Sequence, residues 1–376
     1  MPDRKKKIAF FGIKFYPSKG GSSRVAEGIA RSLKEKYDFT IYCYPDPQAN
    51  EHLKGVNVVH IPSFPLGTLG VFLYYFTCCM HLLFSRKYDL IHVHKTDSAI
   101  FIPFLRFKSP VIATSQEAPY VRDKWSVVGK MYFRIMERFF VRSGAALTSV
   151  SKPLSQYYQE KYMRKVHYIP NGVDIIEERD WQGLAEILQQ YNIDNYVFFA
   201  ARRIMSTKGL HTFLSAARKV NYPYTIVIAG EHSHAQSYMQ QIKDLAKGLP
   251  VKFIGYIGQR SLLMALIEKA EFFIFPSETE GLSLMLLESA STGKTPIICS
   301  DIPENTEVFD PEEVLYFVNK DSDDLGDKLI YADQNSAEMQ IRAHRASQRV
   351  LEQYSIDVVA GQYEVLYEQL LDKVPG

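Results

Sequence analysis

Short apolar runs alternate with segments of helical periodicity along most of this chain, and no other feature of the sequence constrains the fold as strongly. The first series of strand-like runs lies at residues 8–11, 39–43, 58–61, 90–93, 111–114 and 146–150. The second series lies at residues 197–201, 224–229, 251–254, 272–275 and 295–299. Strands that alternate with helices form a parallel sheet, because each helix carries the chain back across a face of the sheet. We therefore expect an α/β fold with two doubly wound, Rossmann-like domains.

A turn at residues 169–173, with proline and Asn-Gly as chain breakers, separates the two series. We place a first Rossmann-like domain at residues 1–173 and a second at 174–355. The length of 376 residues agrees with about two domains. The last segment, 356–376, contains an apolar-periodic helix with no strand after it, so we expect this helix to return to the first domain.

Charge and cysteine content exclude several classes of protein. Lys and Arg number 44 against 42 Asp and Glu, whereas a nucleic-acid-binding domain usually has a strong basic excess. The 4 cysteines are irregularly spaced, which favours buried thiols in a reducing compartment. The apolar or small run 8–12 after Lys7 is shorter than the ~7–15 residues of a signal-peptide core. We expect a cytoplasmic protein that binds no nucleic acid.

The most apolar segment has two interpretations. The aromatic and aliphatic run at 71–84 is shorter than the ~18 residues that indicate a membrane span. With its flanks, which include the cations Arg86 and Lys87, the region 64–87 is typical of a helix that lies in the membrane interface. The alternative is a helix that packs in the core of the first domain.

The loop after the first strand is the first candidate ligand site, because doubly wound sheets bind ligands at the carboxyl ends of their strands. It places Gly20 and Gly21 at the start of a helix, where exposed backbone N–H groups favour an anion. It has neither the G-x-G-x-x-G nor the G-x-x-x-x-G-K-[ST] pattern, which argues against dinucleotide and P-loop enzymes. The alternative is a plain turn.

The loop after the first strand of the second series carries two cations, Arg203 and Lys208, directly before a helix. A planar guanidinium and a compact ammonium beside a helix N-terminus can hold a diphosphate between them. The alternative is that both side chains are solvated at the surface.

A third loop, which leads from an apolar strand into a helix, carries Glu280 and Glu288. Eight positions at helical rise separate the two carboxylates by up to about 12 Å, comparable with a sugar plus a diphosphate. We expect the helix to open at Gly281, so that the N–H groups of residues 281–285 face phosphates. The alternatives are a solvated loop acid and a capped or paired helix acid.

Taken together, the three loops resemble those of the family-4 retaining glycosyltransferases of the GT-B fold. The resemblance covers essentially the whole chain and rests on Gly20-Gly21, Asn171-Gly-Val-Asp174, the Arg203 to Lys208-Gly209 loop and the Glu280-x7-Glu288 motif. It implies two Rossmann-like domains that face each other across a cleft, the first binding the acceptor and the second the nucleotide sugar. Segments 8–12, 88–94 and 122–125 are also similar to a bacterial subgroup that includes rhamnosyltransferases of surface-polysaccharide assembly.

The resemblance implies a role for each matching residue. Arg203 and Lys208 bind the donor diphosphate and Glu280 contacts the transferred sugar, so these three residues form the expected catalytic set. Glu288 holds the ribose of the nucleotide. The remaining expected donor contacts are Gly20 and Gly21 from the opposite domain and Gly281, Leu284 and Met285 from the third loop.

On the acceptor side the chain departs from the family pattern. Many members carry a His-Asp pair after the strand at 111–114, where this chain has Gln116 and Glu117. Retaining transfer by front-face substitution needs no base from the enzyme, since the leaving diphosphate accepts the acceptor proton. We assign Gln116, Glu117 and His94 to the acceptor or sugar side, with a plain loop acid as the alternative for Glu117.

No metal or other cofactor is expected, because two cations and a helix N-terminus can neutralise the leaving phosphates. Asp321-Ser-Asp323 looks like a metal-binding Asp-x-Asp motif, but it directly precedes a helical segment at 325–333 and is typical of an N-cap. His92 and His94 share one strand face without a third ligand nearby in sequence. We expect both in the core, with His94 at the strand end lining the cleft.

The expected function is retaining transfer of a sugar from a nucleoside-diphosphate sugar to a hydroxyl of a glycan or lipid-linked oligosaccharide. The setting implied is bacterial cell-surface polysaccharide synthesis, on the inner face of the cell membrane. Two alternatives stay open at this point: a nucleotide-sugar 2-epimerase, which needs no acceptor, and a non-catalytic protein that binds nucleotide sugars or glycans.

Overall fold

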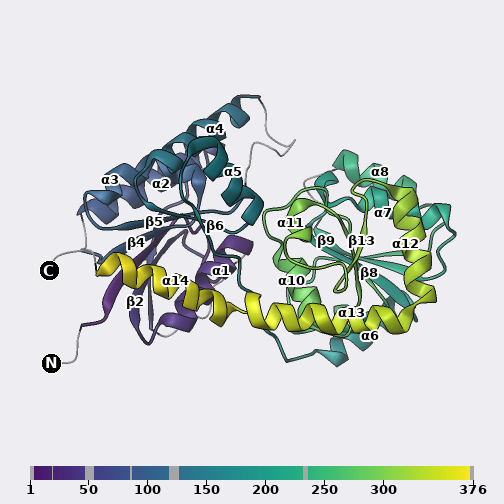
Figure 1. Cartoon of the computed structure of the whole chain (residues 1–376). Coiled ribbons are helices and arrows are strands. Elements are labelled where there is room, and N and C mark those ends of the chain that lie inside the picture. The colour runs from purple at the N-terminus through teal and green to yellow at the C-terminus, as the bar shows by residue number, and fades with distance from the viewer. Residues whose placement is uncertain are drawn as a thin grey trace. The chain divides into compact units, whose positions relative to one another are not determined.

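The computed structural model describes residues 4–18, 20–46, 55–84, 87–117, 127–231 and 236–372. The chain divides into two compact units. Unit 1 comprises Met1–Val173 and Ser355–Gly376, and unit 2 comprises Asp174–Tyr354 (Figure 1). Ser355, which we expected in the second domain, lies in unit 1. The similarity noted at 122–125 falls outside the described residues.

Unit 1 is built on a seven-stranded sheet of order β3-β2-β1-β4-β5-β6-β7, and all its neighbouring strands are parallel. The six strands predicted for the first series are confirmed as β1 to β6. The seventh has only two residues, too few to leave a pattern in the sequence. The strands are β1 (Lys6–Phe11), β2 (Tyr37–Cys43), β3 (Val56–His60), β4 (Leu90–Val93), β5 (Val111–Ser115), β6 (Ala146–Ser149) and β7 (His167–Tyr168).

Helices cover both faces of this sheet (Figure 1). One face carries α1 (Gly21–Leu33) and α14 (Ile356–Leu371), which pack against each other. Their approach is close, because a Cβ added at Gly28 would lie 2.5 Å from a side-chain carbon of Ile356. The other face carries α2 (Gly67–Phe84), the 3₁₀ turn η1 (Thr96–Phe101), α3 (Ile102–Arg106), α4 (Val127–Arg142) and α5 (Lys152–Tyr162).

The helix α2 is longer than the apolar run from which we predicted it. It has 18 residues, and it is the one helix of the described chain that is long and apolar enough, by length and composition alone, to cross a membrane. One side of it is packed into the core of unit 1, where Tyr74, Tyr75, Cys78 and Leu82 are buried. The hydroxyl of Tyr74 donates to the carbonyl of Tyr42 at 2.9 Å. This side of α2 is therefore a core surface, as one of our two interpretations expected.

Unit 2 repeats the architecture with a six-stranded parallel sheet of order β10-β9-β8-β11-β12-β13. The fold class is confirmed: both units are parallel α/β sheets with crossover helices. The strands are β8 (Tyr196–Arg203), β9 (Thr225–Glu231), β10 (Val251–Gly255), β11 (Phe273–Phe275), β12 (Ile297–Ser300) and β13 (Leu315–Phe317). The helices are α6 (Trp181–Tyr191), α7 (Leu210–Lys219), α8 (Gln236–Ala246), α9 (Arg260–Lys269), α10 (Leu284–Ser291), α11 (Pro303–Thr306), α12 (Ser322–Gln334) and α13 (Ser336–Arg349).

Candidate active site

The strand order of unit 2 determines where its ligand site lies. From β8 the chain moves outward to β9 and β10, and it then returns to the other side of β8 with β11. The loops after β8 and β11 therefore leave the sheet in opposite directions, and doubly wound sheets bind their ligands at the carboxyl ends of the strands at such a switch point. The Arg203–Lys208 loop and the Glu280 loop are these two loops. In unit 1 the corresponding switch lies between β1 and β4, the strands that lead to Gly20 and to His94.

Direct backbone contact joins the two loops of unit 2. Gly209 has a φ of +66°, and a Cβ at this position would lie 1.8 Å from the carbonyl oxygen of Pro276. Only glycine satisfies both conditions without strain. The N–H of Glu278 also donates to the carbonyl of Thr207 at 2.9 Å. The loop conformation is thus fixed by the backbone, and the side chains that the two loops carry are held close together.

Lys208 and Glu280 form an ion pair, with Nζ 2.5 Å from Oε1. The Glu280 side chain is 7% exposed and that of Lys208 is 23% exposed, so the pair is only partly shielded from solvent. A lysine ammonium has three donors, and one carboxylate oxygen occupies one of them. The pair can therefore receive a further anion on the ammonium while Glu280 stays in place.

Arg203, the other predicted cation, ends β8 with its side chain about half exposed. Its Nε lies 4.0 Å from Oε2 of Glu231, which ends the neighbouring strand β9. No contact between Arg203 and Lys208 is found within the described ranges. The two predicted cations therefore lie on the same loop but have different carboxylate partners.

Glu288 is buried in α10, and Arg260 holds it in place. Nη2 of Arg260, at the start of α9, lies 2.6 Å from Oε1 of Glu288, and Nη1 lies 3.0 Å from Oδ2 of Asp174. A carboxylate with 3% exposed side-chain surface needs such a partner, because an uncompensated buried charge is strongly destabilising. Arg260 was not among the residues predicted from the sequence. It comes from a separate helix, 28 positions before Glu288, and no local pattern links the two.

The helix α10 begins later than we predicted. It starts at Leu284 with Ser283 as its N-cap, and the Ser283 hydroxyl accepts from the N–H of Leu286 at 3.4 Å. The opening predicted at Gly281 is therefore wrong: this glycine belongs to the loop. The N–H groups at the first two helical positions, Leu284 and Met285, have no partner inside the helix and keep the electropositive character of a helix start.

A second carboxylate of the same loop, Glu278, links it to two neighbouring segments. It lies 3.2 Å from Nε2 of His211 in α7 and 3.2 Å from Nζ of Lys320 after β13. A third carboxyl group, Glu304 of α11, lies in the field of Glu280: burial raises its pKa, and the charge of Glu280 adds to the rise. These residues could not be singled out from the sequence, because they become neighbours only when the loops after β8, β11, β12 and β13 meet in the folded unit.

In unit 1 the glycine loop and the buried histidines can be located. Gly20 is the N-cap of α1 in an extended conformation with no side-chain cap, so the predicted glycine-glycine helix start is confirmed. His92 and His94 are both buried with their rings stacked at 3.8 Å, which confirms their place in the core. Burial lowers the pKa of His94 to about 3. Gln116 and Glu117 follow β5 and are partly exposed.

The Asp321-Ser-Asp323 segment caps a helix, as predicted. The Asp321 carboxylate accepts from the N–H groups of Asp323 and Asp324 at 2.8 and 3.1 Å at the start of α12. In the part of the chain that the structure describes, no group of three His, Cys, Asp or Glu side chains is arranged to hold a metal ion.

Two known families match the chain in succession. Residues 19–177 match Glycosyltransferase Family 4, and residues 185–350 match Glycosyl transferases group 1. Among curated relatives, the O-antigen biosynthesis glycosyltransferase WclY of Escherichia coli is 25% identical over 77% of this chain and 81% of its own. A UDP-Gal:alpha-D-GlcNAc-diphosphoundecaprenol alpha-1,3-galactosyltransferase of Escherichia coli is 26% identical over 60% of each chain.

Solved structures share the whole architecture. The crystal structure of Anabaena Alr3699/HepE in complex with UDP and glucose superposes with a TM-score of 0.79 at 17% identity, over 97% of this chain and all of that one. At this identity the likeness establishes the fold, which is GT-B.

Proposed function

Since the chain belongs to the family-4 glycosyltransferases of the GT-B fold and is similar to an O-antigen biosynthesis glycosyltransferase, we propose that it performs retaining transfer from a nucleoside-diphosphate sugar in surface-polysaccharide synthesis. The acceptor is a hydroxyl of a glycan or of a lipid-linked oligosaccharide. The observation that carries the proposal is the partly shielded Lys208–Glu280 pair at the β8/β11 switch of unit 2, beside the first turn of α10.

The leaving diphosphate is the group that this arrangement stabilises. As the bond between the anomeric carbon and the phosphate oxygen breaks, negative charge develops on the diphosphate. Lys208 presents an ammonium to it, Arg203 a guanidinium with exposed surface, and Leu284 and Met285 two N–H groups at the start of a helix. These charges offset that of the diphosphate, so the proposed step calls for no metal ion.

Glu280 and Glu288 are proposed to hold the two ends of the donor. Glu280 accepts from Lys208, which places its carboxylate beside the diphosphate, where the transferred sugar joins the phosphate. Arg260 fixes the orientation of the Glu288 carboxylate, a suitable acceptor for the hydroxyl groups of a ribose. Gly20 and Gly21 of unit 1 stay proposed as phosphate contacts.

The transfer step balances without a base from the protein. The acceptor oxygen forms a bond to the anomeric carbon on the face from which the diphosphate departs, and the hydroxyl proton passes to an oxygen of the diphosphate. The configuration at the anomeric carbon is therefore retained. Gln116, Glu117 and His94 are proposed to lie on the acceptor or sugar side, where they orient hydroxyl groups.

A lipid-linked acceptor implies a cytoplasmic enzyme at the inner face of the membrane. One of the relatives supports this part of the proposal, because the name of the Escherichia coli galactosyltransferase specifies a substrate carried on diphosphoundecaprenol. Residues 64–87, which include α2, are the segment proposed to contact the membrane.

Binding of nucleoside diphosphates tests the proposal directly. A ligand that binds only the folded protein raises its melting temperature. We expect a rise with one nucleoside diphosphate and its sugar, and a smaller rise with the matched monophosphate, which lacks one of the phosphates that Lys208 and Arg203 hold. No shift with UDP, dTDP, GDP, ADP or CDP would contradict the proposal.

Incubation with the nucleotide sugar alone separates the alternatives. A transferase without acceptor should release the nucleoside diphosphate slowly by hydrolysis. An epimerised nucleotide sugar would instead identify a 2-epimerase, and tight binding with no turnover would identify a binding protein.

A further inference from the structure

One layer of unit 1 carries most of the exposed large apolar side chains of the described chain. Of the 23 such residues, 12 fall within residues 66–139, on or beside α2, α3 and α4. These three helices cover the same face of the sheet (Figure 1). Gathered exposed apolar side chains often mark a site that contacts another molecule or a membrane, so the outward face of α2, α3 and α4 is a candidate interaction surface. We call it the α2–α4 face.

The helix α4 contributes an apolar stripe to this face. Val128, Met131, Ile135 and Phe139 recur at helical spacing along it and are 71%, 57%, 41% and 39% exposed. Met136 and Phe140, which are buried in unit 1, lie on a different side of the helix. The stripe thus runs along the solvent side of the helix over most of its length.

Every charge that α4 presents to solvent is positive. Its only acidic residue, Glu137, is buried, and Lys161 of α5 lies 3.4 Å from its carboxylate. The basic residues Lys130, Arg134, Arg138 and Arg142 lie along the same helix as the apolar stripe. An interfacial membrane helix combines an apolar face with Lys and Arg in this way.

The carboxyl-terminal ends of α2, α3 and α4 are joined into one surface. Lys108 donates to the carbonyl of Leu83 at the end of α2, at 3.0 Å. Arg106 of α3 donates to the carbonyl of Ser143 just after α4, at 3.1 Å. Beside these links stand two highly exposed aromatic side chains, Phe84 at 78% and Phe107 at 90%. Cations and aromatic rings therefore alternate near the amino ends of β4, β5 and β6. The candidate ligand sites lie at the other ends of the strands, the carboxyl ends.

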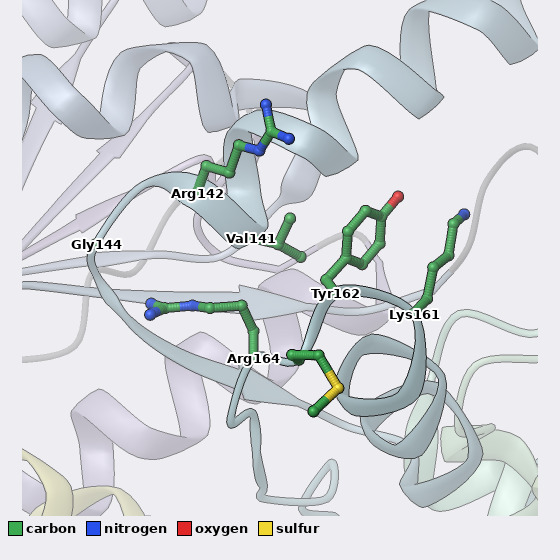
Figure 2. A pocket seen from close by; sticks show the side chains of 7 residues that line it. Val141, Arg142, Gly144, Lys161, Tyr162 and Arg164 are labelled. Atoms are coloured by element: carbon green, nitrogen blue, oxygen red, sulfur yellow. The ribbon is translucent and has the colours of Figure 1, made fainter.

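A cationic pocket lies at the same amino ends of the strands (Figure 2). Arg142, at the end of α4, and Arg164, after α5, line it together with Lys161 and Tyr162. Nε of Arg164 is buried and has no hydrogen-bond partner within the described part of the chain. Three cations line the pocket, and the buried carboxylate of Glu137 pairs with one of them, Lys161. The lining therefore has a net positive charge that favours an anion such as a phosphate.

We propose that the α2–α4 face docks on an anionic lipid bilayer, with Phe84 and Phe107 in the interface, the α4 cations on the headgroups and a lipid phosphate in the Arg142–Arg164 pocket. This inference deepens the membrane contact of the proposed function and rests on it, but it adds α3, α4 and the pocket to residues 64–87. Charge complementarity selects the bilayer as the occupant. A second copy of the chain, paired through this face about a two-fold axis, would place the α4 cations against each other.

Flotation of the full chain with vesicles tests the docking. We compare vesicles of neutral phosphatidylcholine with vesicles that contain one third phosphatidylglycerol, at low and high salt. The expected result is binding that requires the anionic lipid and weakens with salt. Equal recovery with both vesicle types, or a stable dimer in sedimentation whose formation is lost on the same α4 substitutions, would overturn the proposal.

A matched pair of variants locates the surface. The first carries Arg138→Gln and Arg142→Gln on α4, and the control carries Lys243→Gln and Arg345→Gln, two exposed cations of unit 2. Both variants lose two positive charges. Each cation near an anionic surface contributes about fivefold to binding, so the α4 variant should bind about 25-fold more weakly and the control almost normally. Equal loss in both variants, or normal binding of the α4 variant, would refute the assignment.

The same samples separate this inference from the proposed function. The α4 variant should keep its melting temperature and the shift induced by the nucleoside diphosphate, since both cations lie outside the donor site. If vesicle binding fails while that shift persists, the docking inference is wrong and the proposed function stands. If the shift is absent while anionic vesicles bind, the donor assignment is wrong and the docking surface stands.

Discussion

Lys208 and Glu280 show how far single residues can be interpreted from a sequence. Both were singled out from the sequence, each in the loop after a strand, but 72 positions separate them and no pattern in the sequence indicates that they pair. Their contact depends on the β8/β11 adjacency and on the close approach of Gly209 to Pro276. The Arg260–Glu288 contact was missed for a related reason: a lone arginine at a helix start carries no signal until its helix is placed.

Replacement of Lys208 should separate catalysis from folding. Lys208→Met keeps the length of the side chain but removes the charge that is proposed to face the leaving diphosphate. We expect transfer to fall by about 10²–10³, as when a preorganised donor is removed, and the variant to remain folded. Steady-state transfer rates with saturating donor measure the effect. Arg203→Ala should lower transfer by the same order, because this guanidinium is proposed to hold the same diphosphate.

Two controls make that result interpretable. Lys219→Met removes a lysine of the same domain that pairs with Asp323 at the surface, and it should leave transfer unchanged. Lys208→Met leaves the nearly buried Glu280 without its cation, which costs stability. The double variant Lys208→Met/Glu280→Gln removes that cost, and its stability should recover while its activity stays low. Normal turnover in Lys208→Met would eliminate the lysine from the mechanism.

At the scale of elements, the packing of α14 on α1 gives a sharp test. Gly28 of α1 has side-chain carbons of Ile356 within 2.6 Å of the position a Cβ would occupy, whereas Gly361 of α14 has nothing within 4 Å. Gly28→Ala should lower the free energy of unfolding by about 1–3 kcal/mol through overpacking. Gly361→Ala, the matched change, should raise it by about 0.5–1 kcal/mol, since alanine is the better helix former.

Urea unfolding of the full chain measures both changes. Destabilisation by Gly361→Ala, or stabilisation by Gly28→Ala, would show that α14 does not pack on α1 as described.

The elements that the sequence predicted and those that it did not differ in length and patterning. The strands from β1 to β6 and β8 to β12 are apolar runs between clear breakers and were found, with ends that shift by a few residues. The strand β7 has two residues, too few for a period to appear. The strand β13 has three residues, as many as β11, and was missed although it lies in the apolar run 314–318. The helix α13 follows α12 after a single residue, Asn335, and its few buried positions give a weak pattern.

At the scale of the whole molecule, the two-domain α/β fold followed from the sequence, because alternating strands and helices permit few topologies. The boundaries of the units need the structure, since only packing shows that the chain returns to unit 1 at Ser355. The proposed donor site depends on unit 2 as a whole, because side chains from the loops after four of its strands are neighbours there.

The central claim is that a diphosphate binds at the β8/β11 switch of unit 2. A crystal structure of the chain with the nucleoside diphosphate selected by thermal shift tests it most directly. We predict phosphate oxygens within about 3 Å of Nζ of Lys208 and of an N–H in the first turn of α10, with Glu280 still beside the lysine. Phosphates bound elsewhere, such as between Arg142 and Arg164 of unit 1, with the β8/β11 switch unoccupied, would contradict the account.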